Sequence, residues 1–386
     1  MSLQYKSELQ QLHPELVLFH FSKDSSRLYL KLPVKDILYK RNDAGEMVAQ
    51  LNLRLMFYST YETRKFTDSI SLRFSPPYTE DTTAYILKQL DFIKGKQAHL
   101  MAVRLNDLVR GTYAERFMEV NVEEQGAKDF LFVNTATGLP LFNHVSSSSS
   151  LVSVQSGHPV DMFCHHFRKT YPLALPPFSS GTVAFSPGQV DTLFIIKSNN
   201  GLIPLNKGVY YFQTDTLKDT GAALLKFDDD YPLVTRTEAM VEALRYLTTA
   251  EEYAKLNAAQ NKRDAIEDFW LDLSGSKERA RFLIKTFYTR MQEANLYFTS
   301  YLEGWKSDRG MIYLVYGAPF TVYRSSEAEY WDYGNYKSFG PLNFTFKKRR
   351  NPFSENDYSL TRLKTYEPVW YLGVDNWRQG RITTER

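Results

Sequence analysis

Apolar and polar residues alternate along several short stretches of the first 125 residues. Positions 49, 51, 53, 55 and 57 are apolar, whereas positions 50, 52 and 54 are polar. A period of two is typical of a half-buried β-strand. Further short runs of this kind lie at 28–32, 70–74, 100–105 and 117–122, and a short helix is expected near 82–93. Strands at this spacing predict an immunoglobulin-like β-sandwich over residues 1–125.

A second group of strand-like runs predicts another β-sandwich over residues 126–231. The runs lie at 130–133, 160–163, 183–185, 192–196, 208–213 and 224–227. The serines at 146–150 form a low-complexity stretch that is expected to be a solvated loop. Pro172, Pro176 and Pro177 interrupt any longer element, because proline cannot donate to a strand ladder.

The pattern changes after residue 230, where helical spacing replaces the period of two. Thr235 and Thr249 are each followed three residues later by a glutamate, which predicts two capping boxes. A longer helix is predicted over 276–301, because its apolar residues recur every three or four positions. These residues are Leu283, Phe287, Met291, Ala294, Phe298 and Tyr301. Residues 311–316 are expected to form a buried strand, and short aromatic strands are expected to follow. The third predicted domain, residues 232–386, is therefore α+β.

Composition and charge restrict the possible functions. The 386 residues carry a formal net charge of only +3, too small to indicate a nucleic-acid or membrane surface. The single cysteine, Cys164, allows neither an intrachain disulfide nor a thiolate metal cage. The aromatic content of 15% favours strands and surfaces that bind other molecules.

The termini and the hydropathy of the chain bear on where the protein resides. Residues 1–14 have no apolar core and are not a signal peptide as written. No run approaches the ~20 apolar residues that span a bilayer, so no transmembrane segment is expected. A start at Met1 is equally compatible with an export signal that has been replaced. Composition alone therefore leaves the localisation open.

Residues 304–310 read Gly-Trp-Lys-Ser-Asp-Arg-Gly and form the most specific motif of the chain. Gly304 is expected to end the long helix in a left-handed conformation, and Gly310 to lead into the next strand. Trp305 is expected to pack helix against sheet. Ser307 and Asp308 suit hydrogen bonds to backbone N–H groups in a tight turn, and Arg309 suits a pair with Asp308 or another carboxylate. The motif is therefore predicted to be a structural turn without a catalytic residue.

This motif resembles the GWxTD domain of Bacteroidetes-type bacteria. The likeness covers roughly residues 232–386. It includes Asp268, Phe269, Trp270, Tyr288, Arg290, Ala294, Asn295, Tyr316, Gly317, Pro319, Trp331, Tyr333, Trp377, Arg378, Gly380, Arg381 and Ile382. Ser307 stands where the family has threonine, which keeps the hydroxyl and removes a methyl group. The resemblance implies an exported, envelope-associated protein, often a lipoprotein, with β-sandwich modules ahead of the motif. It implies no known reaction.

Two clusters suggest catalytic or metal chemistry. Cys164, His165 and His166 could form a nucleophile pair or a metal site. However, neighbouring residues on a strand face opposite sides, and a buried structural thiol is favoured. Asp308 could join other carboxylates in a hydrolase, but no spacing brings them together. Those carboxylates are Glu303, Glu327, Glu329 and Asp332.

Two charged stretches suggest other ligands. The basic residues 347–350, with Phe344, Phe346 and Phe353 nearby, resemble a nucleic-acid footprint. A solvated hairpin tip is favoured, because the chain as a whole is close to neutral. The aspartates at 228–230 could hold calcium, but an exposed interdomain linker is favoured.

The sequence therefore favours a non-catalytic structural or adaptor protein of the cell envelope. It would bind a protein partner through sandwich edges and through its aromatic-rich C-terminal domain. The candidate binding residues are Tyr316, Trp331, Tyr333, Trp377 and Arg378. No cofactor, metal or nucleic acid is expected, and a lipid anchor in the native precursor is compatible with the resemblance. The alternatives are a glycan-binding protein and a hydrolase-like enzyme that uses Asp308.

Overall fold

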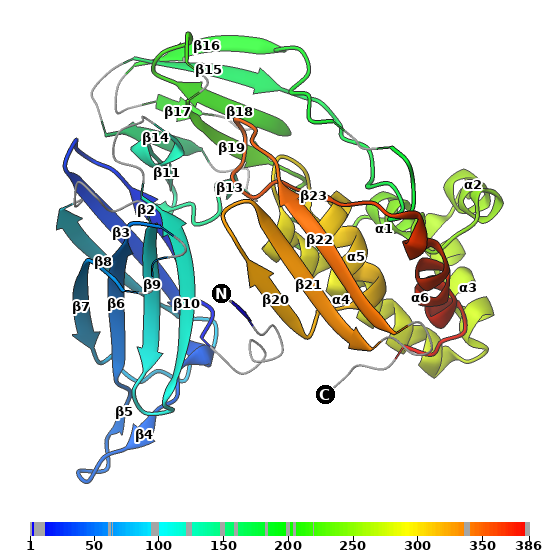
Figure 1. The fold of residues 1–386 in the computed structure, drawn as a ribbon, viewed down its shortest axis with the longest axis horizontal. Coiled ribbons are helices and arrows are strands. Elements are labelled where there is room, and N and C mark those ends of the chain that lie inside the picture. Colours follow the sequence, from blue (N-terminus) through cyan, green and yellow to red (C-terminus); the bar gives the residue numbers. More distant parts are fainter. Residues whose placement is uncertain are drawn as a thin grey trace. The chain divides into compact units, whose positions relative to one another are not determined.

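The chain is mainly β, with many sheets, and its helices gather in the C-terminal part (Figure 1). The computed structural model describes residues 2–3, 12–60, 63, 65–93, 100–120, 126–146, 151–157, 161–181, 184–197, 201–203, 206–218, 220–335 and 340–382. The chain divides into two compact units. The first, here the β unit, comprises Ser7–Phe167 and Val190–Lys226, and the C-terminal unit comprises Met1–Lys6, Arg168–Gln189 and Phe227–Arg386. The three domains drawn from the sequence remain a prediction.

Two sheets with a shared core form the first half of the β unit. One contains β2 (Glu15–Phe19), β3 (Ser25–Pro33) and β8 (Tyr85–Ile93). The other runs β10 (Thr112–Glu119), β9 (Leu100–Asp107), β6 (Leu51–Tyr58), β7 (Asp68–Phe74). Every second residue of β3 and β6 points inward, so Leu30 and Leu53 belong to one core. A short pair, β4 (Lys40–Arg41) and β5 (Met47–Val48), lies outside these sheets.

The helix expected near 82–93 is wrong, because this stretch is strand β8. Ile86, Leu90 and Phe92 lie on one face and join the core, while Lys88 is half-buried on the same side. The apolar residues therefore follow the period of two after all, and antiparallel pairing with β3 fixes the strand.

The second half of the β unit also has two sheets around a core. The first runs β12 (Leu139–Pro140), β11 (Phe130–Asn134), β14 (Val152–Ser156), β17 (Gly201–Ile203). The second runs β13 (Val145–Ser146), β19 (Ala222–Lys226), β18 (Gly208–Gln213), β15 (Met162–Phe167), β16 (Thr192–Ile196). Phe132, Cys164 and Phe212 meet in this core. The order leaves β16 as an edge strand.

Two details of the predicted second domain need correction. Ser146 is buried in β13 and is not part of a solvated loop, while residues 147–150 lie outside the described residues. The strand expected at 183–185 is not formed by residues 184 and 185, and residue 183 lies outside the described residues.

Arg168–Gln189 leaves the β unit after β15 and returns to it at β16, but it packs within the C-terminal unit. We call this segment the strap. The Ala174 N–H donates to the Lys306 carbonyl at 3.0 Å, and the Leu363 N–H donates to the Pro177 carbonyl at 3.1 Å. The ring of Tyr171 also meets that of Tyr301, with 4.6 Å between centroids. The prolines predicted an interruption but not this change of unit.

Helices and one sheet share the core of the C-terminal unit (Figure 1). The helices are α1 (Thr237–Leu244), α2 (Ala250–Ala258), α3 (Lys262–Ser274), α4 (Lys277–Phe298), α5 (Asp308–Tyr316) and α6 (Glu367–Arg378). The sheet runs β1 (Ser2–Leu3), β20 (Thr321–Arg324), β21 (Ala328–Asn335), β22 (Pro341–Lys348), β23 (Tyr358–Leu360). The predicted apolar face of α4 is confirmed, with Leu283, Phe287 and Met291 fully buried.

One of the two predicted capping boxes is confirmed. The Thr249 hydroxyl accepts from the Glu252 N–H at 3.2 Å, and the Glu252 carboxylate accepts from the Thr249 N–H at 2.8 Å. Thr235 does not cap α1, because its N–H and hydroxyl both donate to Asp230 at 2.8 Å. Asp230 therefore accepts hydrogen bonds that fix the turn before α1, and the stretch 228–230 is not simply an exposed linker.

The C-terminal strands expected at 311–316 and near the end of the chain are helices α5 and α6. Residues 311–315 are all buried, so they form a continuous apolar run. Such a run does not distinguish a buried strand from a buried helix. The Ser307 hydroxyl decides the outcome by accepting from the Gly310 N–H at 3.0 Å, which caps a helix.

A fall in pH should weaken the contact between α2 and α6. Two hydrogen bonds from Arg378 hold the pKa of Glu252 at about 2, below its ordinary value. A lowered folded pKa means that this stability is complete above about pH 5 and is lost as the pH falls through about 2. We expect the unfolding free energy to differ less between about pH 5 and about pH 3 in Arg378→Gln than in wild type. The measurement is urea unfolding followed by tryptophan fluorescence.

A neighbouring carboxylate provides the control for this pH experiment. Glu251 is 81% exposed and pairs only with Lys255, one turn away, at 3.2 Å among the described residues. Glu251→Gln should therefore keep the pH dependence of the wild type. An unchanged pH dependence in Arg378→Gln would contradict this account of the α2–α6 contact.

Candidate functional site

Close backbone packing explains both glycines of the motif turn, residues 304–310. A Cβ atom on Gly304 would lie 1.9 Å from the Ala294 carbonyl oxygen of α4, and one on Gly310 would lie 2.0 Å from the Gly304 carbonyl oxygen. The left-handed helix end predicted at Gly304 is wrong. Helix α4 ends earlier, at Phe298, and Gly304 opens a short 3-10 helix, Gly304–Lys306. Glycine is needed here for its missing side chain.

Trp305 and Ser307 fix the turn between α4 and α5. Trp305 is buried in the core of the C-terminal unit, as predicted. The Ser307 hydroxyl donates to the Gly304 carbonyl at 2.7 Å in addition to capping α5. The expected bond from this hydroxyl to a nearby N–H is thus present, although it starts a helix instead of closing a turn before a strand.

Asp308 links three segments of the C-terminal unit. Its carboxylate accepts from the Leu360 N–H of β23 at 2.8 Å and forms a two-pronged ion pair with Arg362. Arg362 in turn donates to the Leu175 carbonyl of the strap at 3.0 Å. The Asp308 side chain is only 10% exposed. Its partners lie about fifty residues away in sequence, so the expected local turn bond is replaced by long-range contacts.

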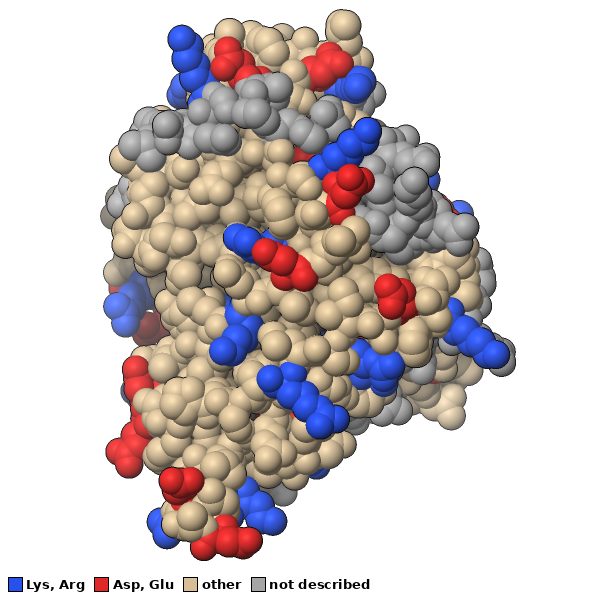
Figure 2. Space-filling model, turned by 90° about the vertical axis from the view of Figure 1, so that its left-hand side faces the viewer, with Lys and Arg blue, Asp and Glu red and all other residues tan. Residues whose placement is uncertain are grey.

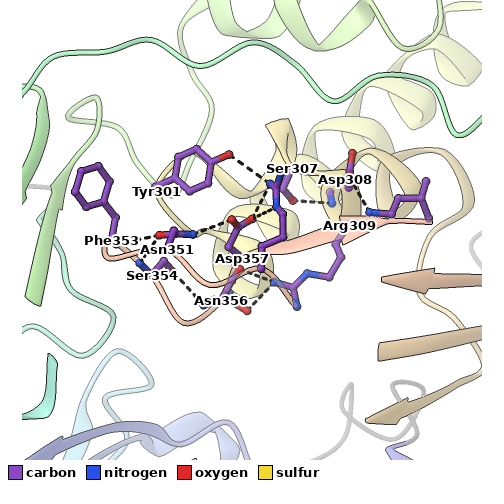
Figure 3. Close-up of polar contacts among 12 residues, drawn as sticks. Tyr301, Ser307, Asp308, Arg309, Asn351, Phe353, Ser354, Asn356 and Asp357 are labelled. Atoms are coloured by element: carbon purple, nitrogen blue, oxygen red, sulfur yellow. Dashed lines mark hydrogen bonds and ion pairs between the residues drawn. The ribbon is translucent and has the colours of Figure 1, made fainter. Parts of the chain in front are cut away.

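Arg309 does not pair with Asp308, and Figure 3 shows the two side chains extending in different directions. The guanidinium lies 3.3 Å from the Glu329 carboxylate and donates to Asn356 Oδ1 at 2.6 Å. It also stacks on the ring of Tyr358, 4.1 Å from the centroid. The sequence predicted that Arg309 pairs with Asp308 or with another carboxylate. The structure forms the second of these pairs, with Glu329.

Glu329 is a buried carboxylate with two cationic partners. Arg324 Nε donates to it at 2.8 Å, and the Trp331 indole N–H donates at 3.0 Å. Burial opposes its charged form, but the positive charges of Arg309 and Arg324 outweigh that cost and lower the pKa of Glu329 below its usual value. Glu329 therefore remains ionised, and its negative charge compensates the buried Arg309.

The loop between β22 and β23 closes over the end of α4 (Figure 3). Asn356 donates to the carbonyls of Tyr297 and Thr299 at 3.2 and 2.9 Å. The buried Asp357 accepts from Arg349 and from Asn351, each at 2.8 Å. The two bonds from Asn356 satisfy one carbonyl in the last turn of α4, which has no partner within the helix, and that of the residue that caps the helix.

Other residues that match the family pattern bind the C-terminal end of α5. Arg290 donates to the carbonyls of Leu314 and Val315 at the end of α5, at 3.1 and 3.2 Å. The Trp377 indole N–H also donates to Val315, at 3.0 Å. The Tyr333 hydroxyl donates to the Gly317 carbonyl at 2.9 Å. Gly317 has a φ of +81°, a backbone conformation that favours glycine.

Most of the predicted binding residues are not available to a ligand. Trp331 and Trp377 are fully buried, and Tyr333 is almost fully buried. Tyr316 is half-buried, with its ring 5.4 Å from that of Phe344. Arg378 is the member of this set that lines a groove, and it does so while paired with Glu252. The four aromatic residues of this set therefore belong to the core of the C-terminal unit.

Three of the four carboxylates considered beside Asp308 for a hydrolase are engaged at separate places. Glu303 pairs with Lys306 at 3.5 Å, Asp332 accepts from the Gly334 N–H at 2.8 Å, and Glu329 lies between two arginines. Among the described residues, no three His, Cys, Asp or Glu side chains are grouped so that they could hold a metal ion.

Cys164 and His166 point to the same, buried side of β15, as predicted. Burial raises the pKa of the Cys164 thiol, which keeps it protonated and unreactive. The ring of His166 stacks on that of Tyr210, with 4.1 Å between centroids. These contacts match the structural interpretation of this cluster.

On the face drawn in Figure 2, Lys, Arg, Asp and Glu side chains are scattered over a surface that consists mostly of other residues, and the described residues drawn there include no broad positive area. Arg349 of the basic run pairs with Asp357, and Phe344 and Phe346 are fully buried. These rings are therefore not exposed for stacking on bases.

A groove of about 1010 Å³ lies within the C-terminal unit and was not predicted. The strap forms one wall from Leu173 to Phe178, and the link between α1 and α2 and helix α6 form the others. Its lining is largely apolar and includes Leu173, Leu175, Phe178, Leu247, Trp370 and Tyr371. Such a site is invisible in sequence because the strap and α6 lie about two hundred positions apart.

Comparison with known families gives one match. A model of the GWxTD domain matches residues 208–379. The matched range begins at β18, ahead of the expected border at 232, and includes the motif turn and most of the groove lining. The comparison with curated proteins gave no match. Within the described residues, no helix is both long and apolar enough to cross a membrane.

The close contact of Gly304 with α4 should make this glycine intolerant of any side chain. We expect Gly304→Ala to lower the free energy of unfolding of the C-terminal unit by about 3 kcal/mol or more, because the backbone of α4 must move. All five tryptophans lie in this unit, so urea unfolding followed by their fluorescence measures the effect.

Gly275→Ala in the same unit is the matched control. Gly275 has a φ of +69°, and no atom lies within 4 Å of the position that an added Cβ would take. This substitution should cost only about 1 kcal/mol, from backbone strain alone. A Gly304→Ala protein that is as stable as wild type would contradict the packing described for the motif turn.

Proposed function

Because this chain belongs to the GWxTD domain-containing family, we propose that it is a non-catalytic structural or adaptor protein of the bacterial cell envelope. It binds a protein partner through an exposed sheet edge of the β unit and through the C-terminal unit. Two immunoglobulin-like β-sandwich domains and a lipid anchor in the precursor are part of this proposal. The family resemblance supports them.

The state of the motif turn favours a structural role over catalysis. The Asp308 carboxylate is bound by a backbone N–H and by both prongs of Arg362. A catalytic acid or base must reach a substrate proton, whereas this carboxylate is already shared among α5, β23 and the strap. We therefore do not propose a hydrolase.

A glycan-binding role is also less well supported. Sugar rings stack on exposed aromatic faces, and tryptophan offers the largest one. All five tryptophans, Trp270, Trp305, Trp331, Trp370 and Trp377, are at most 5% exposed. All five tryptophans belong instead to the buried core of the C-terminal unit.

Strand β16 carries the proposal of partner binding. It is an edge strand, hydrogen-bonded to β15 on one side. Leu193 and Ile195 alternate with the inward-facing Phe194 and Ile196, and they are 57% and 59% exposed. Soluble proteins usually protect such edges with charge or proline. An edge with apolar residues on its open face suits an extended partner segment that adds a strand.

Charge on this edge should weaken partner binding without loss of the fold. We expect Leu193→Lys with Ile195→Lys to reduce specific capture of an envelope partner about tenfold or more, because both anchors are lost. The measurement is in-cell cross-linking followed by quantitative mass spectrometry of the purified complexes.

Leu217→Lys is the matched control, because Leu217 is an exposed leucine of the β unit that lies outside any strand. It should capture the same partner as wild type. The proposal is wrong if the double variant captures the partner as well as wild type does, or if wild type captures no specific partner at all.

A further inference from the structure

Strand β16 is open along one side. Among the described residues, its hydrogen-bonded strand neighbour is β15, and the sheet order ends at β16 (Figure 1). The N–H and C=O groups of an antiparallel edge strand point in turn toward its neighbour and away from it, so part of this backbone faces outward. A second strand of similar length can pair with these outward groups.

The residues of β16 form a pattern that matches itself when the strand is reversed. Leu193 and Ile195 are exposed and lie one residue to either side of Phe194. Asp191 directly precedes the strand, Lys197 directly follows it, and both are exposed. In either direction from Phe194, the chain therefore presents an exposed apolar residue and then a charge. The two charges are opposite in sign.

A two-fold axis at Phe194 would pair β16 with β16 of a second copy in the antiparallel direction. Leu193 would then lie opposite Ile195 of the second copy. Asp191 would lie opposite Lys197, once at each end of the pair. Opposite charges directly across two strands stabilise the pairing, and like charges destabilise it. A shift by two residues in either direction would set a charge against an apolar residue, so the pattern favours one register.

The nearest acidic residue on β15 is compatible with this arrangement. Met162 pairs with Ile196, so the same register continued by one step places Asp161 beside Lys197. In the pair of copies, Lys197 would lie between this aspartate and Asp191 of the second copy. Charges would then alternate in sign across the joined strands, which is the favourable order. The pairing does not require either charge to lack other contacts.

The exposed side chains of β16 favour burial against another strand. Leu193 and Ile195 lie beside His165 and Phe163 of β15, which are half-buried. Thr192–Ile196 contains no charged residue and no proline, the usual protection of an edge strand. A strand of five residues buries less than a standard interface of about 1,600 Å², so we expect a reversible dimer that depends on concentration.

We propose that the partner at β16 is a second copy of this chain, bound by antiparallel pairing of the two β16 strands about Phe194. The two five-stranded sheets then form one continuous sheet in a closed, two-fold symmetric dimer. This inference rests on the proposed adaptor role, because it names the partner of the edge that the role uses.

Charge reversal tests the pairing and its direction. The full chain is examined by sedimentation velocity from about 1 to about 300 μM, a range that covers reversible dimers. Asp191→Lys or Lys197→Asp alone brings like charges together at both ends and should raise the dimer Kd about tenfold or more. The Asp191→Lys, Lys197→Asp protein should dimerise like wild type. An equimolar mixture of the two single variants should form mixed dimers.

Disulfide trapping tests the register. Leu193→Cys and Ile195→Cys proteins are mixed and oxidised, and the expected register brings position 193 of one copy opposite position 195 of the other. The mixed disulfide should therefore form faster than either disulfide between identical variants. The native Cys164 is buried and does not compete. Leu217→Cys, at an exposed leucine outside any strand, gives the background rate.

The inference is overturned if the chain stays monomeric over the whole concentration range, or if the dimer is indifferent to both single charge reversals. Faster trapping between identical variants would also overturn it. A monomeric chain whose β16 edge captures a different protein in cells would contradict this inference and leave the proposed function standing. Absence of any cross-link at β16 in cells, to a second copy or to another protein, would contradict both.

Discussion

The ion pair between Asp308 and Arg362 is the contact on which the arrangement of the C-terminal unit depends. Asp308 begins α5, accepts from β23 and holds the arginine that reaches the strap. A charge pair with little solvent exposure is stable only when its other polar groups are also bound. The backbone N–H of Leu360 and the carbonyl of Leu175 supply two such bonds, although the buried Arg362 Nε has no partner among the described residues. Helix, sheet and strap are positioned together by these contacts.

The glycines of the motif turn make this contact possible. Gly304 lets the chain touch α4, and Gly310 lets α5 touch the turn. Asp308 and Arg309 then leave the first turn of α5 in different directions, one toward the strap and the other toward Glu329 and the loop before β23. A compact backbone turn thus places the negative Asp308 and the positive Arg309 in two separate sets of contacts. The groove lies beside the strap that one of these sets of contacts holds.

Local pattern was sufficient for much of the fold. The period of two predicted β6, short strand-like runs predicted β3 and β18, and the capping box and apolar face predicted α2 and α4. The sequence failed where tertiary contacts decide between alternatives. Residues 311–316 form an apolar run that fits strand and helix equally, and the cap from Ser307 selects the helix.

The candidate site was predicted only in part, because its partners are distant in sequence. The motif itself was recognisable, but Glu329, Asn356 and Arg362 carry no local signal that connects them to it. The same holds for the strap, whose prolines indicated a break without indicating where the chain goes. Aromatic residues misled for a related reason, since a buried and an exposed tryptophan look alike in sequence.

Substitution of Asp308 by asparagine tests most directly whether the motif turn is structural. Asp308→Asn keeps the size of the side chain but leaves Arg362 without its counter-charge. The account predicts a loss of about 3–5 kcal/mol in the unfolding free energy of the C-terminal unit, measured by tryptophan fluorescence in urea. It also predicts faster tryptic cleavage in the strap, at Arg168 or Lys169. Unchanged stability and unchanged cleavage, together with lost partner binding, would contradict it.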